Sequence, residues 1–184
     1  MKHYRPFARI MAIAIASTVM TACSLDSYEL KKPFTTDPVG KVHLWCIGQP
    51  GTRSVADAEK FLFTDDDIEW FDLNTRELRF RDTMEPLCEE IPLLTKIDFY
   101  LGGEHLFSGG ATCVGLNCSQ VFDDLVLCCG KIDGEVIDDG RYYLYDCYPL
   151  QFIDTDEVKA NRLRRASQWE AFLKYLESMG KLKK

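Results

Sequence analysis

The amino-acid sequence predicts an α+β fold, in which one long C-terminal amphipathic helix packs on a mostly antiparallel β-sheet of five to seven strands. Three observations lead to this prediction. Short segments rich in β-branched and aromatic residues recur between turn residues along most of the chain. A Gly-Gly pair between two of these segments is typical of a tight hairpin turn. The end of the chain instead carries apolar residues at helical spacing.

The expected strands follow one another in the order of the sequence. Each is a short apolar or alternating run that ends at turn residues, and the run at 68–80 divides into two strands around a turn at 73–76. The polar segment 130–140 is expected to be a loop that joins the last two strands. The strand segments are 42–46, 61–63, 68–80, 96–107, 124–129 and 141–148.

The hairpin at 96–107 is the clearest local prediction. Gly102 and Gly103 supply the positive φ angles of a two-residue turn. A turn centred there pairs Tyr100 with His105 and Phe99 with Leu106. The core face of the hairpin would then consist of Ile97, Phe99, Leu101 and Leu106, because side chains alternate along a strand.

The closing helix is expected over residues 156–179. Asp156 and Glu157 suit the positive end of its dipole, and Gly180 is a typical helix terminator. An apolar stripe at helical spacing predicts the face that packs on the sheet. Its members are Val158, Leu163, Ala166, Trp169, Leu173 and Leu176.

The N-terminus resembles the export signal of bacterial lipoproteins. Three basic residues precede an apolar run of eleven residues, 10–20, which is shorter than the roughly 20 residues that a membrane span needs. Met20-Thr21-Ala22-Cys23 then resembles a lipobox. The resemblance implies that residues 1–22 are removed as a signal peptide and that Cys23 is acylated and becomes the new N-terminus. An ordinary secretory signal followed by a disulfide cysteine is the alternative.

The rest of the chain divides into a tether and one domain. Residues 23–38 are polar with two prolines and read as a flexible tether, and residues 39–184 form a single globular α+β domain. Loss of residues 1–22 removes three basic residues and no acidic one, which changes the formal net charge from −7 to −10. This charge argues against nucleic acid as a partner. Ser24 after the anchor favours the outer membrane, with periplasmic or surface exposure left open.

Several runs resemble a family of small lipoproteins from Bacteroidetes, which has no assigned activity. They are LFTDDDIEWFDLNTRELRF, KIDFYLGGEHLF, DDLVLC with GRYYLYDCYPL, and the closing NRLRRASQWEAFLKYLESMGKL. The resemblance implies an anchored protein with one folded unit, and it implies no catalytic residue.

Seven of the eight cysteines remain once Cys23 is assigned to the lipid. Disulfides are the expected state in an exported protein, and an odd number leaves at least one thiol outside an intrachain bridge. Cys113 and Cys118 are the best candidate pair. Cys128 and Cys129 should point to opposite faces of their strand, and a Cys128–Cys147 bond is disfavoured by the expected register. A zinc site built from these thiols is disfavoured by their spacing.

The sequence contains no signature of a catalytic or metal centre, so no catalytic residue, metal ligand or cofactor is assigned. Acidic residues in loop 130–140 make calcium a minor option there. Cys113 and His105 are the residue types of a cysteine–histidine dyad, but no other feature of the sequence supports one. Paired carboxylates acting on glycans keep an envelope hydrolase open as an alternative function.

Tyrosines gather on the expected strand 141–148. Tyr143 and Tyr145 share one face and are the candidate platform for a sugar or protein ligand, and packing under the helix is the competing interpretation. The leading hypothesis is therefore a non-enzymatic lipoprotein of the cell envelope, held to the membrane by its N-terminal lipid, with an envelope protein or a glycan as partner. A carbohydrate-binding module is the other alternative.

Overall fold

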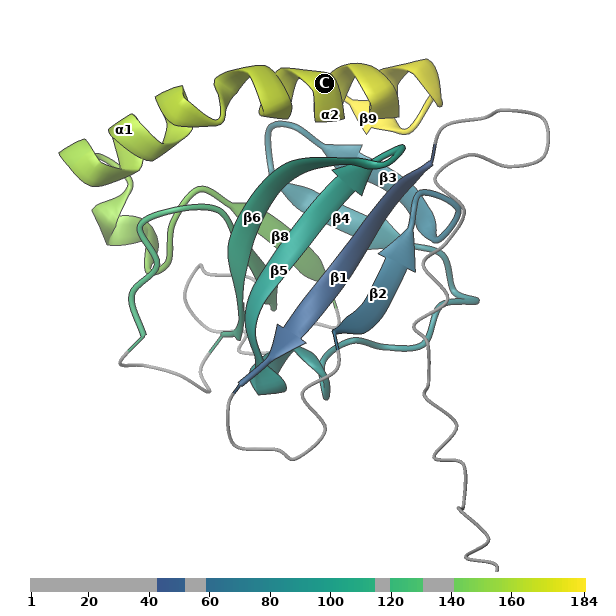
Figure 1. Cartoon of the computed structure of the whole chain (residues 1–184), viewed down its shortest axis with the longest axis horizontal. Helices are drawn as coiled ribbons and strands as arrows, with labels where there is room; N and C mark the ends of the chain where they lie inside the picture. The colour runs from purple at the N-terminus through teal and green to yellow at the C-terminus, as the bar shows by residue number, and fades with distance from the viewer. Residues whose placement is uncertain (1–42, 52–58, 115–119, 131–140) are drawn as a thin grey trace, which may run out of the picture.

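The structure, a computed structural model, describes residues 43–51, 59–114, 120–130 and 141–184. Within these ranges the chain forms one curled sheet of nine strands, half of a barrel in shape, with two helices in line across one end of it (Figure 1). The strands lie in the order β2-β1-β5-β6-β7-β8-β4-β3-β9. Their bounds are β1 Leu44–Pro50, β2 Lys60–Thr64, β3 Ile68–Asp72, β4 Glu77–Phe80, β5 Leu94–Leu101, β6 Glu104–Cys113, β7 Val126–Cys129, β8 Tyr142–Tyr145 and β9 Leu182–Lys183.

The predicted fold class is wrong in two respects. The sheet has nine strands rather than five to seven, and the single helix expected over 156–179 is two helices, α1 (Asp156–Arg164) and α2 (Ala166–Ser178). Short 3₁₀ helices, η1 (Ile91–Leu93) and η2 (Leu150–Phe152), precede β5 and α1. The residues that the structure describes are mainly β, with 42% in strands and 23% in helices.

Strand β9 is the one strand of the nine that corresponds to no strand segment predicted from the sequence. Gly180, at φ 68°, lets the chain reverse directly after α2. The reversal brings Leu182 beside Phe71 in a parallel pairing with β3. Two residues are too few to produce an alternating pattern, so this strand has no signal in the sequence.

The curl of the sheet accompanies several irregularities in its register. Register shifts interrupt the pairings of β1, β3 and β5, and such β-bulges increase the local twist of a strand. Neighbouring strands run parallel in two places, β6–β7 and β3–β9, and antiparallel elsewhere in the sheet. The inner face of the curled sheet holds the main core.

The hairpin of β5 and β6 turns at Gly102 and Gly103 as predicted, but of the two only Gly102 has a positive φ, at 65°. Tyr100 pairs with His105 as expected, but Phe99 pairs with Phe107 instead of Leu106. A register shift between Phe99 and Tyr100 adds one residue to the β6 side. Phe107 therefore takes the buried core position, and Leu106 is only partly buried.

Helix α2 closes the core from one end of the sheet. Phe172 is fully buried and makes edge contacts, with ring centroids 5.6–6.1 Å apart, to Phe71, Phe99 and Phe107. The predicted apolar stripe therefore missed Phe172. It also wrongly included Leu163, which is 79% exposed.

A second, smaller cluster lies on the opposite face of β7 and β8. Cys129 belongs to the main core and Cys128 to this cluster, so the two cysteines point to opposite faces as predicted. A disulfide joins Cys88 to Cys129, with their Cα atoms 5.8 Å apart. It links the segment before η1 to the centre of the sheet. The remaining members of the second cluster are Val126, Tyr143, Tyr145 and Tyr148.

Candidate functional site

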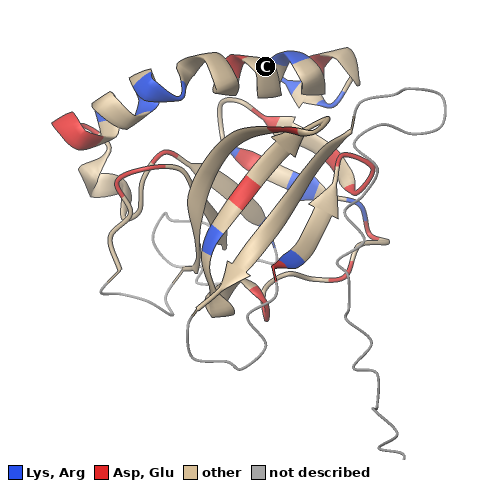
Figure 2. Ribbon diagram, in the orientation of Figure 1, with Lys and Arg blue, Asp and Glu red and all other residues tan. Residues whose placement is uncertain are grey.

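Three arginines surround one buried carboxylate where the helices meet the sheet. Arg76 comes from the turn between β3 and β4, and Asp146 directly follows β8. Arg162 lies in the last turn of α1, and Arg165 is the residue between α1 and α2. Figure 2 shows the matching charge pattern of α1, with acidic residues at its start and basic residues toward α2. We call Arg76, Asp146, Arg162, Arg165, Ala166 and Trp169 the arginine pocket, because they line one cavity of about 300 Å³.

The backbone of Arg76 is held in an unusual conformation. Its φ is 64°, the left-handed region that a side chain with a Cβ rarely adopts. The side chain of Asp72 accepts hydrogen bonds from the backbone N–H groups of Asn74 and Thr75, which fixes the turn. The backbone N–H of Leu144 donates to the carbonyl of Arg76 at 2.9 Å, which ties the turn to β8. Strained residues of this kind concentrate at functional sites.

The ion pairs of the pocket centre on Asp146, whose side chain is 7% exposed. Arg76 Nη2 lies 2.5 Å from Asp146 Oδ2, and Arg162 Nε lies 3.1 Å from the same oxygen. Arg165 donates to Asp146 Oδ1 with one nitrogen and to Asp124 with the other. Three positive and two negative charges meet here, so the group carries a formal charge of +1 within an acidic protein.

Two donors of the pocket are left over. Arg76 Nη1 and Arg162 Nε are buried and make no hydrogen bond to the residues that the structure describes, although Arg162 Nε is close enough to Asp146 Oδ2 for an ion pair. Burial lowers the pKa of Arg76; Asp146 opposes this shift, while Arg162 and Arg165 add to it. Arginine nevertheless stays protonated in proteins. The pocket therefore holds uncompensated positive charge, which is the chemistry that binds an anionic group.

One wall of the pocket is aromatic. The guanidinium carbon of Arg76 lies 4.9 Å from the centroid of the Trp169 ring, a cation–π contact. Trp169 in turn stacks on Phe172 and is edge-on to Phe71. The main core thus fixes the ring, and the ring positions Arg76.

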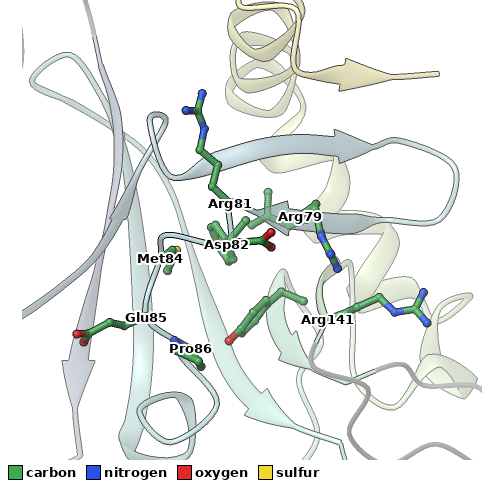
Figure 3. A pocket seen from close by; sticks show the side chains of 10 residues that line it. Arg79, Arg81, Asp82, Met84, Glu85, Pro86 and Arg141 are labelled. Atoms are coloured by element: carbon green, nitrogen blue, oxygen red, sulfur yellow. The ribbon is translucent and has the colours of Figure 1, made fainter.

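A second hollow lies beside β4 and has a different character. It has a volume of about 260 Å³, and its lining includes Arg79, Arg81 and Arg141 together with Asp82 and Glu85. Figure 3 shows the Arg81 side chain directed away from those of Arg79 and Arg141. Two of its arginines make long ion pairs: Arg79 Nε lies 3.9 Å from Glu69 Oε2, and Arg141 Nη1 lies 3.8 Å from Glu77 Oε2. Because its lining carries charges of both signs on exposed side chains, this hollow has no clear preference for an anionic or a cationic ligand.

Ser108, His105 and Asp98 lie together on β5 and β6, but they do not form a catalytic triad. Ser108 Oγ donates directly to Asp98 Oδ1 at 2.5 Å, and His105 Nε2 is 3.0 Å from the same oxygen. In a triad the histidine stands between serine and carboxylate and uses both ring nitrogens. Here Ser108 Oγ and His105 Nε2 both contact the same oxygen, Asp98 Oδ1. The Ser108 hydroxyl therefore donates its hydrogen to the carboxylate, and the histidine is not placed to activate it as a nucleophile.

One group of possible metal ligands is present in the described part of the chain. His43, Asp65 and Asp66 bring one ligand atom each within 4.8 Å of one another. Asp65 is fully buried, and its carboxylate already engages His43 Nδ1 at 3.0 Å and the hydroxyl of Tyr175 at 2.5 Å. Burial, followed by Asp65, raises the pKa of Tyr175, which keeps its hydroxyl protonated as the donor. These contacts give the group a structural role that joins α2 to the start of β1.

The residues selected from the sequence are placed as follows. Cys23, Cys118 and the acidic residues of loop 130–140 that made calcium an option lie outside the described residues. Cys113 is buried, and its Sγ is 3.5 Å from the carbonyl oxygen of Cys88. His105 and Cys113 are separated by eight positions of β6, about 27 Å at ~3.4 Å per residue, so they form no dyad.

Tyr143 and Tyr145 are 1% and 8% exposed and stack on each other with ring centroids 5.4 Å apart. A stacking platform needs an exposed ring face. These two rings pack instead into the second cluster, on the face of β7 and β8 opposite the main core, whereas the competing interpretation placed them under the helix.

Comparison with known proteins identifies no relative: no family model, no curated protein and no solved structure matches this chain. Among the residues that the structure describes, neither helix has the length and apolar character that a membrane-spanning helix needs.

Proposed function

We propose that this protein is a non-enzymatic lipoprotein of the cell envelope, anchored at the outer membrane through Cys23, and that its domain binds an anionic ligand in the arginine pocket. The basic start, the short apolar run and Met20-Thr21-Ala22-Cys23 support the anchor. The observation that carries the binding function is the pair of buried donors, Arg76 Nη1 and Arg162 Nε, that make no hydrogen bond in the described structure.

A purely structural network would balance its own charges. Buried ion pairs stabilise a fold only when each charge is paired and hydrogen-bonded. Here Arg165 is fully engaged by Asp124 and Asp146, whereas Arg76 and Arg162 share one oxygen of Asp146. An anion that enters the cavity would supply the missing acceptors.

The binding function is tested by thermal unfolding of the detergent-purified protein at constant ionic strength, with chloride replaced by acetate, phosphate or sulfate. A ligand that binds only the folded state raises the Tm. We expect at least one anion to raise the Tm of the wild type and Arg162→Gln to abolish the rise. Arg164→Gln is the matched control, because Arg164 is exposed on the same helix and does not line the cavity. An equal rise in wild type and Arg162→Gln would refute binding at this pocket.

The anchor is tested separately by the intact mass of the membrane-extracted protein. We expect the mass of residues 23–184 plus acyl chains. Cys23→Ser should abolish acylation. After the membranes are washed with salt, the variant should be found in the supernatant and not in the membrane fraction. A mass without acyl chains for the wild type would show that Cys23 is not a lipid anchor. The proposal that the arginine pocket binds an anion would not be affected by that result.

A further inference from the structure

We infer that the arginine pocket selects a monocarboxylate with a short, flat apolar body, in preference to a phosphate or sulfate group. The inference rests on the proposed anion binding and specifies its ligand class. It follows from three properties of the pocket: its net charge, the number of its open donors and the nature of its wall.

The net charge favours a ligand with one negative charge. Arg76, Arg162 and Arg165 stand against Asp124 and Asp146, which leaves +1. A carboxylate neutralises this charge completely. A phosphate group carries about −1.5 to −2 at pH 7, so it would leave negative charge beside Asp146. Uncompensated charge is costly in a place where Arg165 and Asp146 are themselves only 8% and 7% exposed.

The open donors match the two oxygens of a carboxylate. Nη1 of Arg76 is free, whereas Nη2 of the same guanidinium is occupied by Asp146. The side chain of Arg162 is 39% exposed, and its ion pair with Asp146 is made through Nε. One ligand oxygen can therefore accept from Arg76 and the second from Arg162. Planar guanidinium groups recognise planar carboxylates in this manner.

The wall of the pocket favours an apolar body behind the carboxylate. Trp169 is half-buried and Ala166 is exposed, and both line the cavity beside the arginines. Trp169 is held rigidly by Phe172 and Phe71, so its accessible surface offers a fixed apolar contact. A cavity of about 300 Å³ lies at the lower end of the range for small-molecule sites.

The test compares benzoate, acetate, phosphate, sulfate and the neutral amide benzamide by isothermal titration of the detergent-purified full protein at constant ionic strength. We expect benzoate to bind at least tenfold more tightly than phosphate, sulfate or benzamide, and acetate to fall between. Arg162→Gln should weaken benzoate at least tenfold, and Arg164→Gln should leave it unchanged. Trp169→Leu should weaken benzoate more than acetate.

Two further probes separate the sources of such a carboxylate. Acetyl-glycyl-phenylalanine with a free carboxylate represents a peptide C-terminus, and its C-terminal amide is the control. Tighter binding of the free peptide acid than of benzoate would identify a peptide end as the source, and the reverse would identify a small organic acid.

The titrations distinguish failure of the carboxylate preference from failure of anion binding itself. Phosphate or sulfate binding as tightly as benzoate, with loss in Arg162→Gln, would overturn the carboxylate class and leave anion binding intact. No titration signal for any anion would overturn both.

Discussion

The carboxylate of Asp98 collects donors from three strands on the outer face of the sheet. Gln49 Nε2 and Lys96 Nζ contact Oδ2 at 2.8 Å and 3.0 Å, and Ser108 and His105 contact Oδ1. Burial raises the pKa of Asp98, but hydrogen bonds from Lys96, Ser108 and His105 outweigh it, so that the pKa is lowered overall. The ionised form is thus the one that the fold stabilises.

Asp98→Asn should lower the free energy of unfolding by about 1–3 kcal/mol at pH 7, because the amide presents donors to Gln49 and Lys96 in place of an acceptor. A group with a lowered folded-state pKa stabilises the fold above its unfolded pKa of about 3.9 and loses this contribution as the pH falls through the folded pKa. The difference between wild type and variant should therefore shrink below about pH 4. Urea unfolding over a pH series measures it, and a difference that stays constant down to pH 2 would contradict this account.

Arg165 decides the arrangement of the two helices. It departs from helical geometry with φ −94° and ψ 6°, and it separates α1 from α2. Its side chain is 8% exposed, and its guanidinium reaches Asp124 before β7 and Asp146 after β8. The bend in the helix therefore coincides with the residue that fastens it to the sheet.

Arg165→Gln should lower the free energy of unfolding by about 3–5 kcal/mol, because it leaves the buried Asp146 with less compensation. Arg162→Gln, which removes a more exposed partner, should change it by at most about 1 kcal/mol. Urea unfolding of both variants at pH 7, with Arg164→Gln as the control, measures the contrast. Equal effects of the Arg165 and Arg162 variants would mean that Arg165 does not anchor the helices.

The disulfide acts on the molecule as a whole. Cys88 and Cys129 are 41 residues apart in sequence, and the bridge fastens the segment before η1 to the central strand β7. A bridge that closes a loop of this length restricts the unfolded chain substantially. A disulfide is also the expected state in the oxidising compartment to which the proposed export signal would direct the protein.

Replacement of both Cys88 and Cys129 by alanine should lower the free energy of unfolding by about 2–5 kcal/mol. Urea unfolding of the double variant measures this loss, and wild type unfolded under reducing conditions should show a similar loss. If the wild type is unaffected by the reductant while the double variant is destabilised, lost packing of the buried Cys129 would be the cause.

Local patterns in the sequence were sufficient for several elements. Gly102 and Gly103 placed the β5–β6 turn, and the Tyr100–His105 pair followed from it. The alternation of side chains along a strand placed Cys128 and Cys129 on opposite faces, as the structure has them. The Phe107 position was missed, because the bulge at Phe99 depends on how the sheet curls over its core.

The arginine pocket could not be predicted in the same way. Asp146 is 70 residues from Arg76 and 19 residues from Arg165 along the chain. Only the placement of β8 next to β4, with the helix junction beside them, brings these charges together. The basic residues at 162–165 were visible in the sequence, but basic residues near the end of a helix usually only complement its dipole.

The sequence by itself determined the positions of most strands and the helical character of the C-terminal segment, because these depend on residues close together in the chain. The tertiary structure decided the nine-stranded order, the pairing of Cys88 with Cys129, the burial of Tyr143 and Tyr145, and the arginine pocket. These features depend on contacts between distant residues, and such contacts are fixed by how the whole sheet curls and buries its inner face.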